Sequence, residues 1–312
     1  MAESKKIATR DSYGHALEEL GAENPNIVVL DADLSSSTRT SYFAKKYPDR
    51  FFSAGIAESN MTGMAAGLAA CGKIPFISTF AMFAAGRAYE QVRNSIGYPH
   101  LNVKIGATHA GISVGEDGAS HQCNEDIALM RTIPGMVVLN PSDDVEARAC
   151  VRAAASYEGP VYMRFGRYAV PVFNDPSQPF KIGEGTILRE GNDVTIVATG
   201  ICVAAALDAA KILEEKHISA EVINICTIKP IDEELLIASA AKTGKVVTAE
   251  EHSVIGGLGS AVAEVLSEKL PTKLMRIGIQ DQFGESAPAA QLIQKYGLDG
   301  AGIAAKTAEF LS

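Results

Sequence analysis

The stretch "RFFSAGIAESNMTGMAAGLAACGKIPFIST", residues 50–79, decides the fold class of this chain. It joins two short apolar runs of strand character, residues 50–56 and 74–79, through a segment of small residues with helical character. Strands that alternate with helices pair in parallel, because each helix returns the chain to the starting edge of the sheet. One carboxylate, Glu58, stands where the first strand gives way to the helix. Burying a carboxylate is costly unless a partner or a ligand uses it.

The same alternation extends on both sides of this stretch. Runs of strand character cover residues 26–33, 50–56, 74–79, 102–109, 136–141 and 161–165. Segments with a 3.6-residue apolar period, such as residues 80–97 and 143–158, lie between them. Strands separated by helical crossovers predict a mostly parallel six-stranded sheet with helices on both faces.

A second α/β unit follows a segment of different composition. Residues 171–183, "PVFNDPSQPFKIG", contain three prolines and little periodicity, which is typical of a domain linker. Beyond it we expect strands over 193–200, 220–225, 245–250 and 272–279, with helices near 203–216 and 260–269. The sequence therefore predicts two three-layer α/β domains, residues 1–172 and a smaller one over 187–312, joined by a linker over 173–186.

Composition excludes several classes of protein. The net charge is −9, with 37 acidic and 28 basic residues, which argues against a broad surface for nucleic acid or for an anionic membrane. Local basic residues can still hold a phosphate. The five cysteines are scattered and form no CxxC pair, so neither a disulfide framework nor a zinc site is indicated. We find no signal core and no apolar run long enough to span a bilayer, and we expect a cytoplasmic protein.

Chemically suggestive residues follow the predicted strands of the first domain. In an open parallel sheet, ligands bind outside the carboxyl ends of the strands. The residues at these ends are Asp31, Asp33, Glu58, Phe80, Phe83, His109, Asn140 and Arg164. Their common position on one edge of one sheet predicts a ligand site there.

Each of these residues also has an ordinary structural explanation. A carboxylate at a helix N-terminus, as expected for Glu58, is favoured by the helix dipole. Phe80 and Phe83 have a spacing that also builds cores. In "THAGISVGEDGASHQ", residues 108–122, two histidines flank a glycine-rich acidic loop, which favours function because imidazole exchanges protons near neutral pH. Asp117 in this loop either orients a hydroxylated substrate or caps its turn.

Two further features of the sequence could bind an anion. Arg10, Ser37 and Arg164 are candidates to hold an anionic substrate end, although a single arginine is more often a surface charge. The segment "EEHSVIGGLGS", residues 250–260 with His252, is glycine-rich but has no GxGxxG pattern. We interpret it as a contact between domains or subunits.

Several motifs resemble a known family. "GIAESNM" (55–61), "PFISTFAMF" (75–83) and above all "THAGISVGEDGASHQCNEDIALMRTIPGMVVLNPSD" (108–143) resemble the pyrimidine-binding domain of transketolase. The rest of the chain is similar to the C-terminal domain of that family, so the resemblance runs from about residue 5 to the end. It implies a thiamine-diphosphate enzyme that moves a two-carbon ketol unit from a ketose phosphate to an aldose phosphate.

The resemblance also implies roles for single residues. Glu58 would bind N1′ of the cofactor's aminopyrimidine and activate the cofactor. Phe80 and Phe83 would pack on that ring, and Asp33 would lie near the cofactor. The remaining candidates would face the substrate: His109 and His121 contact and protonate its oxygens, Asp117 recognises a sugar hydroxyl, and Arg10, Ser37 and Arg164 bind the sugar phosphate.

Some features depart from the family pattern. Gly86 stands where many members carry an aromatic residue, and Ser59 and Asn60 replace the usual neighbours of the glutamate. The GDG motif that binds the diphosphate and its metal is missing, and the only "LDG" is at 298–300, close to the C-terminus. We therefore expect the C-terminal subunit of a split transketolase. A separate N-terminal subunit would carry the GDG motif and Mg²⁺ (or Ca²⁺), and two copies of each chain would form an α2β2 assembly around a homodimer of this chain.

Three alternatives remain open. "AGI" after His109 and "EEHSVIGGLGSAV" also resemble 1-deoxyxylulose-5-phosphate synthase and the 2-oxo acid dehydrogenase β subunit. The "GEDGASHQ" loop favours transketolase over both. A non-catalytic scaffold subunit would have no use for Glu58, the two histidines and Asp117 together.

Overall fold

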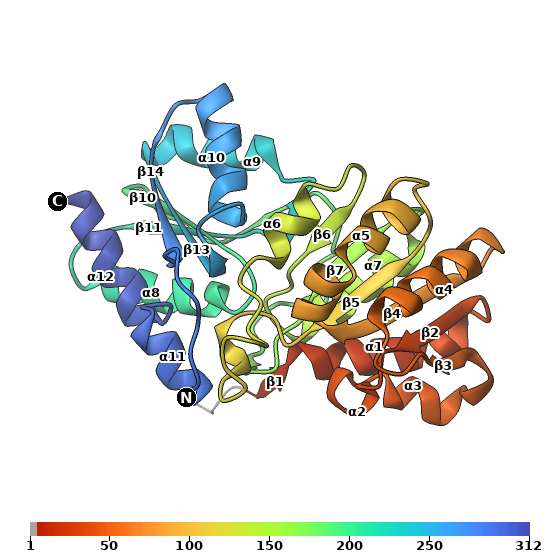
Figure 1. Ribbon diagram of the computed structural model, residues 1–312. Helices are drawn as coiled ribbons and strands as arrows, with labels where there is room; N and C mark the ends of the chain where they lie inside the picture. Colours follow the sequence, from red (N-terminus) through yellow and green to blue (C-terminus); the bar gives the residue numbers. More distant parts are fainter. Residues whose placement is uncertain (1–4) are drawn as a thin grey trace.

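The computed structural model describes residues 5–312, and Figure 1 shows two α/β units side by side. The first unit is built on a seven-stranded sheet with the order β12-β6-β7-β5-β4-β2-β3. Its strands are β2 (Ile27–Asp31), β3 (Phe51–Ser53), β4 (Ile74–Phe80), β5 (Lys104–Thr108), β6 (Val137–Leu139), β7 (Val161–Arg164) and β12 (Thr227–Lys229). The first six coincide with the six predicted strands and pair in parallel, which confirms the predicted fold class.

The seventh strand, β12, was not predicted. It lies beyond the linker in sequence, yet it pairs antiparallel with β6, and Thr227 lies opposite Leu139. A run of three residues is too short to show a strand period in the sequence. The pairing ties the C-terminal part of the chain into the edge of the first sheet.

Helices cover both faces of the first sheet, as the buried character of its strands requires. They are α1 (Thr9–Glu23), α2 (Ser35–Thr38), α3 (Ser41–Lys46), α4 (Glu58–Ala70), α5 (Tyr89–Gln91), α6 (Asp126–Arg131) and α7 (Asp144–Ser156). One core cluster contains Tyr13, Phe43 and Phe165, and a second contains Met61, Ile105 and Tyr162. Short 3₁₀ turns cover Pro48–Arg50 and Ile112–Val114.

The segment over residues 80–97 differs from the single helix that its apolar period predicts. It contains two π-helical turns, η2 (Phe83–Arg87) and η3 (Val92–Gly97), on either side of α5. The backbone N–H of Ala88 donates to the carbonyl of Phe83, which closes the wider turn of η2. Such turns insert one residue into a helix and are frequent at functional sites.

The second unit carries a five-stranded sheet with the order β14-β13-β10-β11-β9. Its strands are β9 (Thr186–Arg189), β10 (Val194–Ala198), β11 (Ala220–Asn224), β13 (Lys245–Ser253) and β14 (Lys273–Ile279). Its helices are α8 (Cys202–Glu214), α9 (Glu233–Thr243), α10 (Leu258–Lys269), α11 (Ala289–Lys295) and α12 (Gly300–Leu311). The antiparallel edge strand β9 was not predicted, and it begins at the last residue of the expected linker. A small ribbon, β1 (Lys6–Ala8) with β8 (Ala169–Pro171), completes the chain.

The two units meet at a buried polar contact. His252 of β13 is fully buried, and its Nε2 accepts the backbone N–H of Ala128 at 3.4 Å. The guanidinium of Arg164 donates to the backbone carbonyl of Glu251 at 2.8 Å. The interpretation of residues 250–260 as a domain contact is confirmed. None of the helices within residues 5–312 is both long enough and apolar enough to cross a bilayer.

Candidate active site

The carboxyl ends of β2, β4 and β5 bring the candidate residues together. Asp31, at the end of β2, is fully buried and accepts hydrogen bonds from the backbone of Leu34 and the hydroxyls of Thr38 and Thr40. It therefore shapes the loop after β2. Asp33 in this loop is exposed and has the left-handed φ of 63°. For a residue other than glycine such a conformation is strained and is common at functional sites.

Glu58 begins α4 with its side chain 2% exposed. Its Oε1 accepts a hydrogen bond from Nη1 of Arg87 at 2.9 Å. Its Oε2 is buried and has no hydrogen-bond partner in the part of the chain that the structure describes. Since a buried oxygen without a partner carries a desolvation penalty, this atom fits a donor supplied from outside the chain.

Aromatic rings lie near this carboxylate, since the guanidinium carbon of its partner Arg87 is 4.7 Å from the centroid of the Phe83 ring. The rings of Phe80 and Phe83 stack with centroids 5.9 Å apart and planes 17° from parallel. Phe80 also stacks on His109 at 3.9 Å, and Phe83 meets the edge of His121 at 5.6 Å. Two stacked rings near an unpartnered carboxylate oxygen fit a planar heterocycle with a ring nitrogen, such as an aminopyrimidine.

His109 is 3% exposed and is surrounded by positive charge. Nη1 of Arg10 lies 2.8 Å from its Nε2, and the hydroxyl of Thr108 lies 2.9 Å from its Nδ1. A guanidinium only donates, so Nε2 accepts and Nδ1 carries the proton. Burial, together with the charges of Arg10 and Arg167, lowers the pKa of His109 to about 3. This side chain is therefore neutral near pH 7 and has no proton to give at Nε2, contrary to the expected role.

His121 and Asp117 occupy the more open part of the same loop. His121 is half-buried, and its Nδ1 lies 3.0 Å from the hydroxyl of Ser120. Asp117 is exposed, and one of its oxygens lies 3.5 Å from Nη1 of Arg167. Both side chains are accessible to a ligand that approaches the aromatic rings.

Three guanidinium groups gather near His109. Nη1 of Arg10 donates to the carbonyl of Ser37 at 3.2 Å, and its Nε is buried without a partner among the described residues. Arg39 pairs with Asp11 at 2.5 Å, and Arg167 donates to the carbonyl of Val114 at 2.8 Å. The charges of Arg10, Arg39 and Arg167 all lower the pKa of His109. Together they form a cationic end of the site, suited to an anion.

The assignment of Arg164 to this cationic end was wrong. Its side chain is 3% exposed and forms a buried ion pair with Asp126, with Nε and Oδ2 2.9 Å apart. Its Nη2 donates to the carbonyls of Cys123 and Glu251. Arg164 is the last residue of β7 and its side chain enters the domain contact, so a phosphate could reach it only by breaking this network.

We expect Arg164→Ala to destabilise the fold instead of weakening substrate binding. Removing one partner of a buried ion pair leaves the other charge uncompensated, which costs about 3–5 kcal/mol. Urea unfolding of the isolated chain measures this loss. Arg167→Ala is the matched control, because Arg167 is 38% exposed and its removal should change the free energy of unfolding little. Equal unfolding midpoints for the two variants would contradict the structural role of Arg164.

Comparison with known proteins places the chain in a family. The profile of the transketolase pyrimidine-binding domain matches residues 5–172, and that of the transketolase C-terminal domain matches residues 183–303. The chain belongs to the transketolase family. A relative from Methanocaldococcus jannaschii, provisionally described as a transketolase C-terminal section, is 56% identical over 96% of this chain and 95% of its own length.

Other transketolase relatives match over nearly the whole chain. A split-gene transketolase, solved as an inactive β4 tetramer, is 59% identical with a TM-score of 0.90 and covers 98% of this chain and 99% of its own. The 6-deoxy-6-sulfo-D-fructose transketolase subunit SqwH of Clostridium sp. is 46% identical over 93% of this chain and 90% of its own length. A 1-deoxy-D-xylulose-5-phosphate synthase of Geobacter sulfurreducens is 41% identical over 96% of this chain, which spans only 47% of that protein.

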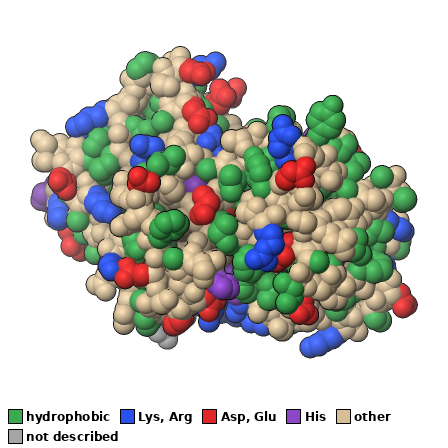
Figure 2. Space-filling view, viewed as in Figure 1, with side chains coloured by type: hydrophobic (Ala, Val, Ile, Leu, Met, Phe, Trp, Pro, Cys, Tyr) green, Lys and Arg blue, Asp and Glu red, His purple; other side chains and the backbone are tan. Residues whose placement is uncertain are grey.

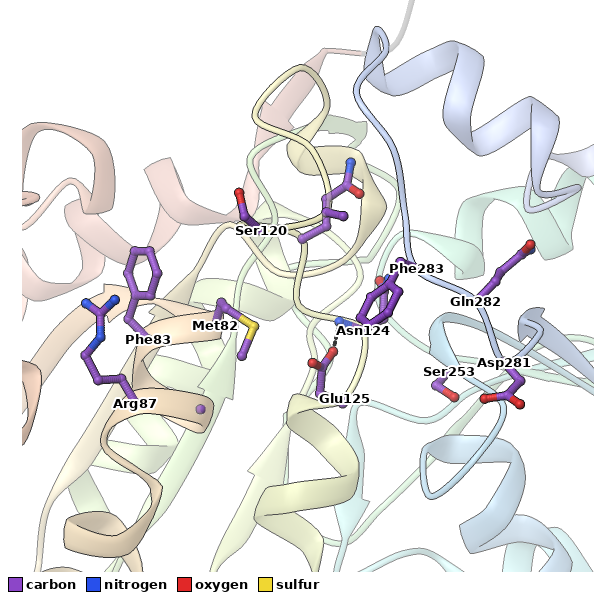
Figure 3. A pocket seen from close by; sticks show the side chains of 13 residues that line it. Met82, Phe83, Arg87, Ser120, Asn124, Glu125, Ser253, Asp281, Gln282 and Phe283 are labelled. Carbon is purple, nitrogen blue, oxygen red and sulfur yellow. Dashed lines mark hydrogen bonds between the residues drawn. The ribbon is translucent and has the colours of Figure 1, made fainter.

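A cavity of about 760 Å³ lies between the two transketolase domains, next to the aromatic rings (Figure 3). Met82, Phe83, Gly86 and Arg87 line one side, and Asp281 to Phe283, after β14, line the other. A Cβ atom on Gly86 would lie 2.4 Å from the terminal methyl of Met82. Met82 therefore occupies the space into which a side chain at position 86 would grow.

Sequence reasoning missed Arg39, Arg87 and Arg167. Arg167 lies three residues beyond the end of β7, and the rule on strand ends selected Arg164, the last residue of that strand, in its place. Arg39 lies eight residues after Asp31 beyond a short helix, and no spacing rule points to it. Arg87 depends on a π-helical turn, which has no clear sequence signal.

Proposed function

We propose that this chain is the C-terminal subunit of a split transketolase. It would transfer a two-carbon ketol unit from a ketose phosphate to an aldose phosphate with thiamine diphosphate. The observation that carries this proposal is the buried, unpartnered Oε2 of Glu58 beside the stacked rings of Phe80 and Phe83. A scaffold subunit gains nothing from an uncompensated buried oxygen.

Each candidate residue has a separate role in such a reaction. Thiamine diphosphate, when bound, supplies the carbanion chemistry. Glu58 shares a proton with the ring nitrogen through Oε2, while Phe80 and Phe83 hold the plane of the ring and exclude water. His121 exchanges a proton with a substrate oxygen. Neutral His109 accepts a hydrogen bond from Arg10 and holds this guanidinium at the site, and Asp117 receives a sugar hydroxyl.

The cationic end would hold the phosphate of the sugar. Arg10, Arg39 and Arg167 replace the set expected from the sequence, and the loop of Ser37 is tied to Arg10 through its carbonyl. Relatives named for a sulfo-sugar and for apulose 4-phosphate show that the anionic sugar varies within the family. Three guanidinium groups favour a phosphate, which carries more charge than a sulfonate near neutral pH.

We expect Arg10→Ala or Arg167→Ala to raise KM for phosphorylated sugars by about 10-fold or more, because each loses a charge-assisted hydrogen bond. KM for a sugar without phosphate should stay nearly constant. Steady-state kinetics of the reconstituted complex on both kinds of sugar is the measurement, with the exposed Arg152→Ala as control. Equal losses on both sugars would show that these arginines are structural.

The 1-deoxyxylulose-5-phosphate synthase and 2-oxo acid dehydrogenase alternatives use a 2-oxo acid as donor. The loop "GEDGASHQ" and the full-length match to a split-gene transketolase favour ketol transfer. Assaying the complex with pyruvate and with a ketose phosphate as donor separates these reactions. Turnover with pyruvate as donor, and none with a ketose phosphate, would replace the proposal by one of the alternatives.

The exposed face of α4 is the surface on which we propose that another chain packs. A Cβ atom on Gly63 or Gly67 would meet nothing within 4 Å among the described residues, and Ile56 before this helix is 78% exposed. On the side of the molecule that carries α4, Figure 2 shows mostly tan and green atoms with few charges. We propose that a second copy of this chain packs here and that an N-terminal subunit carrying the GDG motif and Mg²⁺ or Ca²⁺ completes an α2β2 enzyme. The inactive β4 tetramer of the split-gene relative supports assembly of such chains without activity.

We expect Gly63→Leu to block this assembly while the chain itself stays folded. Leucine has the higher helix propensity, so α4 gains up to about 1 kcal/mol, but its side chain fills the space that a neighbouring chain needs. Light scattering after size-exclusion chromatography measures the mass of the assembly. Ser267→Leu, on an exposed position of α10, is the matched control. Assembly of the Gly63 variant at wild-type mass would exclude this face as the contact.

A further inference from the structure

We propose that Arg87 is a positioning residue for Glu58. It would hold Oε1 of the carboxylate so that Oε2 is the oxygen presented to the ring nitrogen of the cofactor. This inference rests on the proposed function, since it assigns the orientation of the carboxylate that the function uses.

The contacts of Arg87 join the two parts of the site. Its Nη1 donates to Oε1 of Glu58 at 2.9 Å, and its guanidinium carbon lies 4.7 Å from the centroid of the Phe83 ring. A cation over an aromatic face is attracted by the ring quadrupole. Figure 3 shows Phe83 and Arg87 rising side by side from the same segment. The guanidinium of Arg87 thus packs on the ring of Phe83 and at the same time binds the carboxylate of Glu58.

The backbone explains why this arginine is available. Phe83 and Arg87 are the first and last residues of the π-helical turn η2, and both side chains line the cavity between the domains. Small residues, Ala84 to Gly86, separate them, so nothing bulky comes between the ring and the guanidinium. The π-helical turn places the cation of Arg87 at the N-terminus of α4, where Glu58 begins the helix.

The asymmetry of the carboxylate is the central point. Glu58 is almost completely buried, and within residues 5–312 its side chain has one ion-pair partner, Arg87. That contact engages one oxygen and leaves the other unpartnered. Rotating the carboxylate by part of a turn would break a charge-assisted hydrogen bond, whereas a half-turn only exchanges its two equivalent oxygens. Arg87 therefore fixes the plane of the carboxylate and leaves one oxygen free, and without it the buried charge would lose its cation.

The first test uses the chain by itself and needs no activity. Urea unfolding is measured for Arg87→Met, Glu58→Gln and the double variant, which together form a double-mutant cycle. We expect Arg87→Met to raise the unfolding equilibrium constant several-fold when Glu58 is present, and to have a smaller effect when residue 58 is glutamine, because only the contact with Phe83 is then lost. Arg93→Met, at an exposed position in the next turn, is the control. Equal effects of Arg87→Met in both backgrounds would overturn the coupling.

The second test uses the enzyme reconstituted with its N-terminal subunit. At saturating thiamine diphosphate we expect Arg87→Ala to lower kcat at least 10-fold and to change the circular-dichroism signal of the bound aminopyrimidine. Arg87→Lys should retain part of both, and added guanidinium ion should restore kcat of Arg87→Ala. An unchanged kcat and signal in Arg87→Ala would overturn this inference and leave the proposed function intact. Activity in Glu58→Gln would instead overturn the proposed function itself.

Discussion

Replacing Glu58 with glutamine is expected to abolish ketol transfer by the reconstituted enzyme while the chain remains folded. An amide cannot share a proton with the ring nitrogen of the aminopyrimidine as a carboxylate does. Losing one positioned proton-transfer group lowers a rate by about 100-fold or more. Because glutamine has nearly the same shape, the stacking of Phe80 on Phe83 should persist.

This expectation is checked by steady-state rates together with the unfolding midpoint of the chain. Glu90→Gln is the matched control, because Glu90 lies exposed in α5 and contacts only nearby polar side chains such as Gln91 and Asn94. It should keep wild-type rates. A Glu58→Gln enzyme with more than about a tenth of the wild-type rate would be incompatible with the assigned role, since a proton-transfer group contributes far more than that.

The first sheet could be predicted from the sequence because its strands are buried on both faces. Runs such as Ile27–Asp31 and Lys104–Thr108 are continuous blocks of mostly apolar residues between helical segments. β12 and β9 could not be predicted in the same way, because both are short antiparallel edge strands whose pairing depends on tertiary context.

The site could be predicted in outline because parallel strands place their ends on one edge. This rule brought Glu58, Phe80 and His109 together before any coordinates were known. It failed at the end of β7, where the strand end was predicted to within one residue but the side chain of Arg164 enters the domain contact. Arg167, three residues later, reaches the site. The position of a residue at a strand end does not say to which side its side chain points, and this is enough to exchange a structural arginine for a candidate ligand-binding one.

The protonation of His109 also lay beyond the sequence. A histidine in a glycine-rich loop suggests a proton carrier with a pKa near neutrality. The structure buries it and places Arg10, Arg167 and Arg39, which come from three separate segments, around it, and burial together with these charges lowers its pKa to about 3. Because this pKa is so low, the imidazole of His109 would take up a second proton only in strong acid. The pH dependence of catalysis between pH 5 and 8 should therefore contain no limb from His109.

The chain purified alone is expected to show no ketol transfer, even with excess thiamine diphosphate and Mg²⁺. Its described residues offer Glu58 and the aromatic rings for one end of the cofactor. The sequence contains no GDG motif for the diphosphate end. A ring held by stacking and a single hydrogen bond gains little of the binding energy that the charged diphosphate and its metal would supply.

Adding a subunit that carries the GDG motif should restore cofactor binding and turnover together, because the site is then completed across the contact between the chains. Calorimetric titration of thiamine diphosphate with Mg²⁺, run with and without that subunit, measures the first effect, and a coupled ketol-transfer assay measures the second. The Gly63→Leu variant tests whether cofactor binding also needs the contact between two copies of this chain: if it does, adding the subunit should leave the variant unable to bind the cofactor tightly, whereas Ser267→Leu should respond like the wild type. Full activity of the chain without any partner would show that it binds the diphosphate through residues of its own, and the split-enzyme proposal would then be untenable.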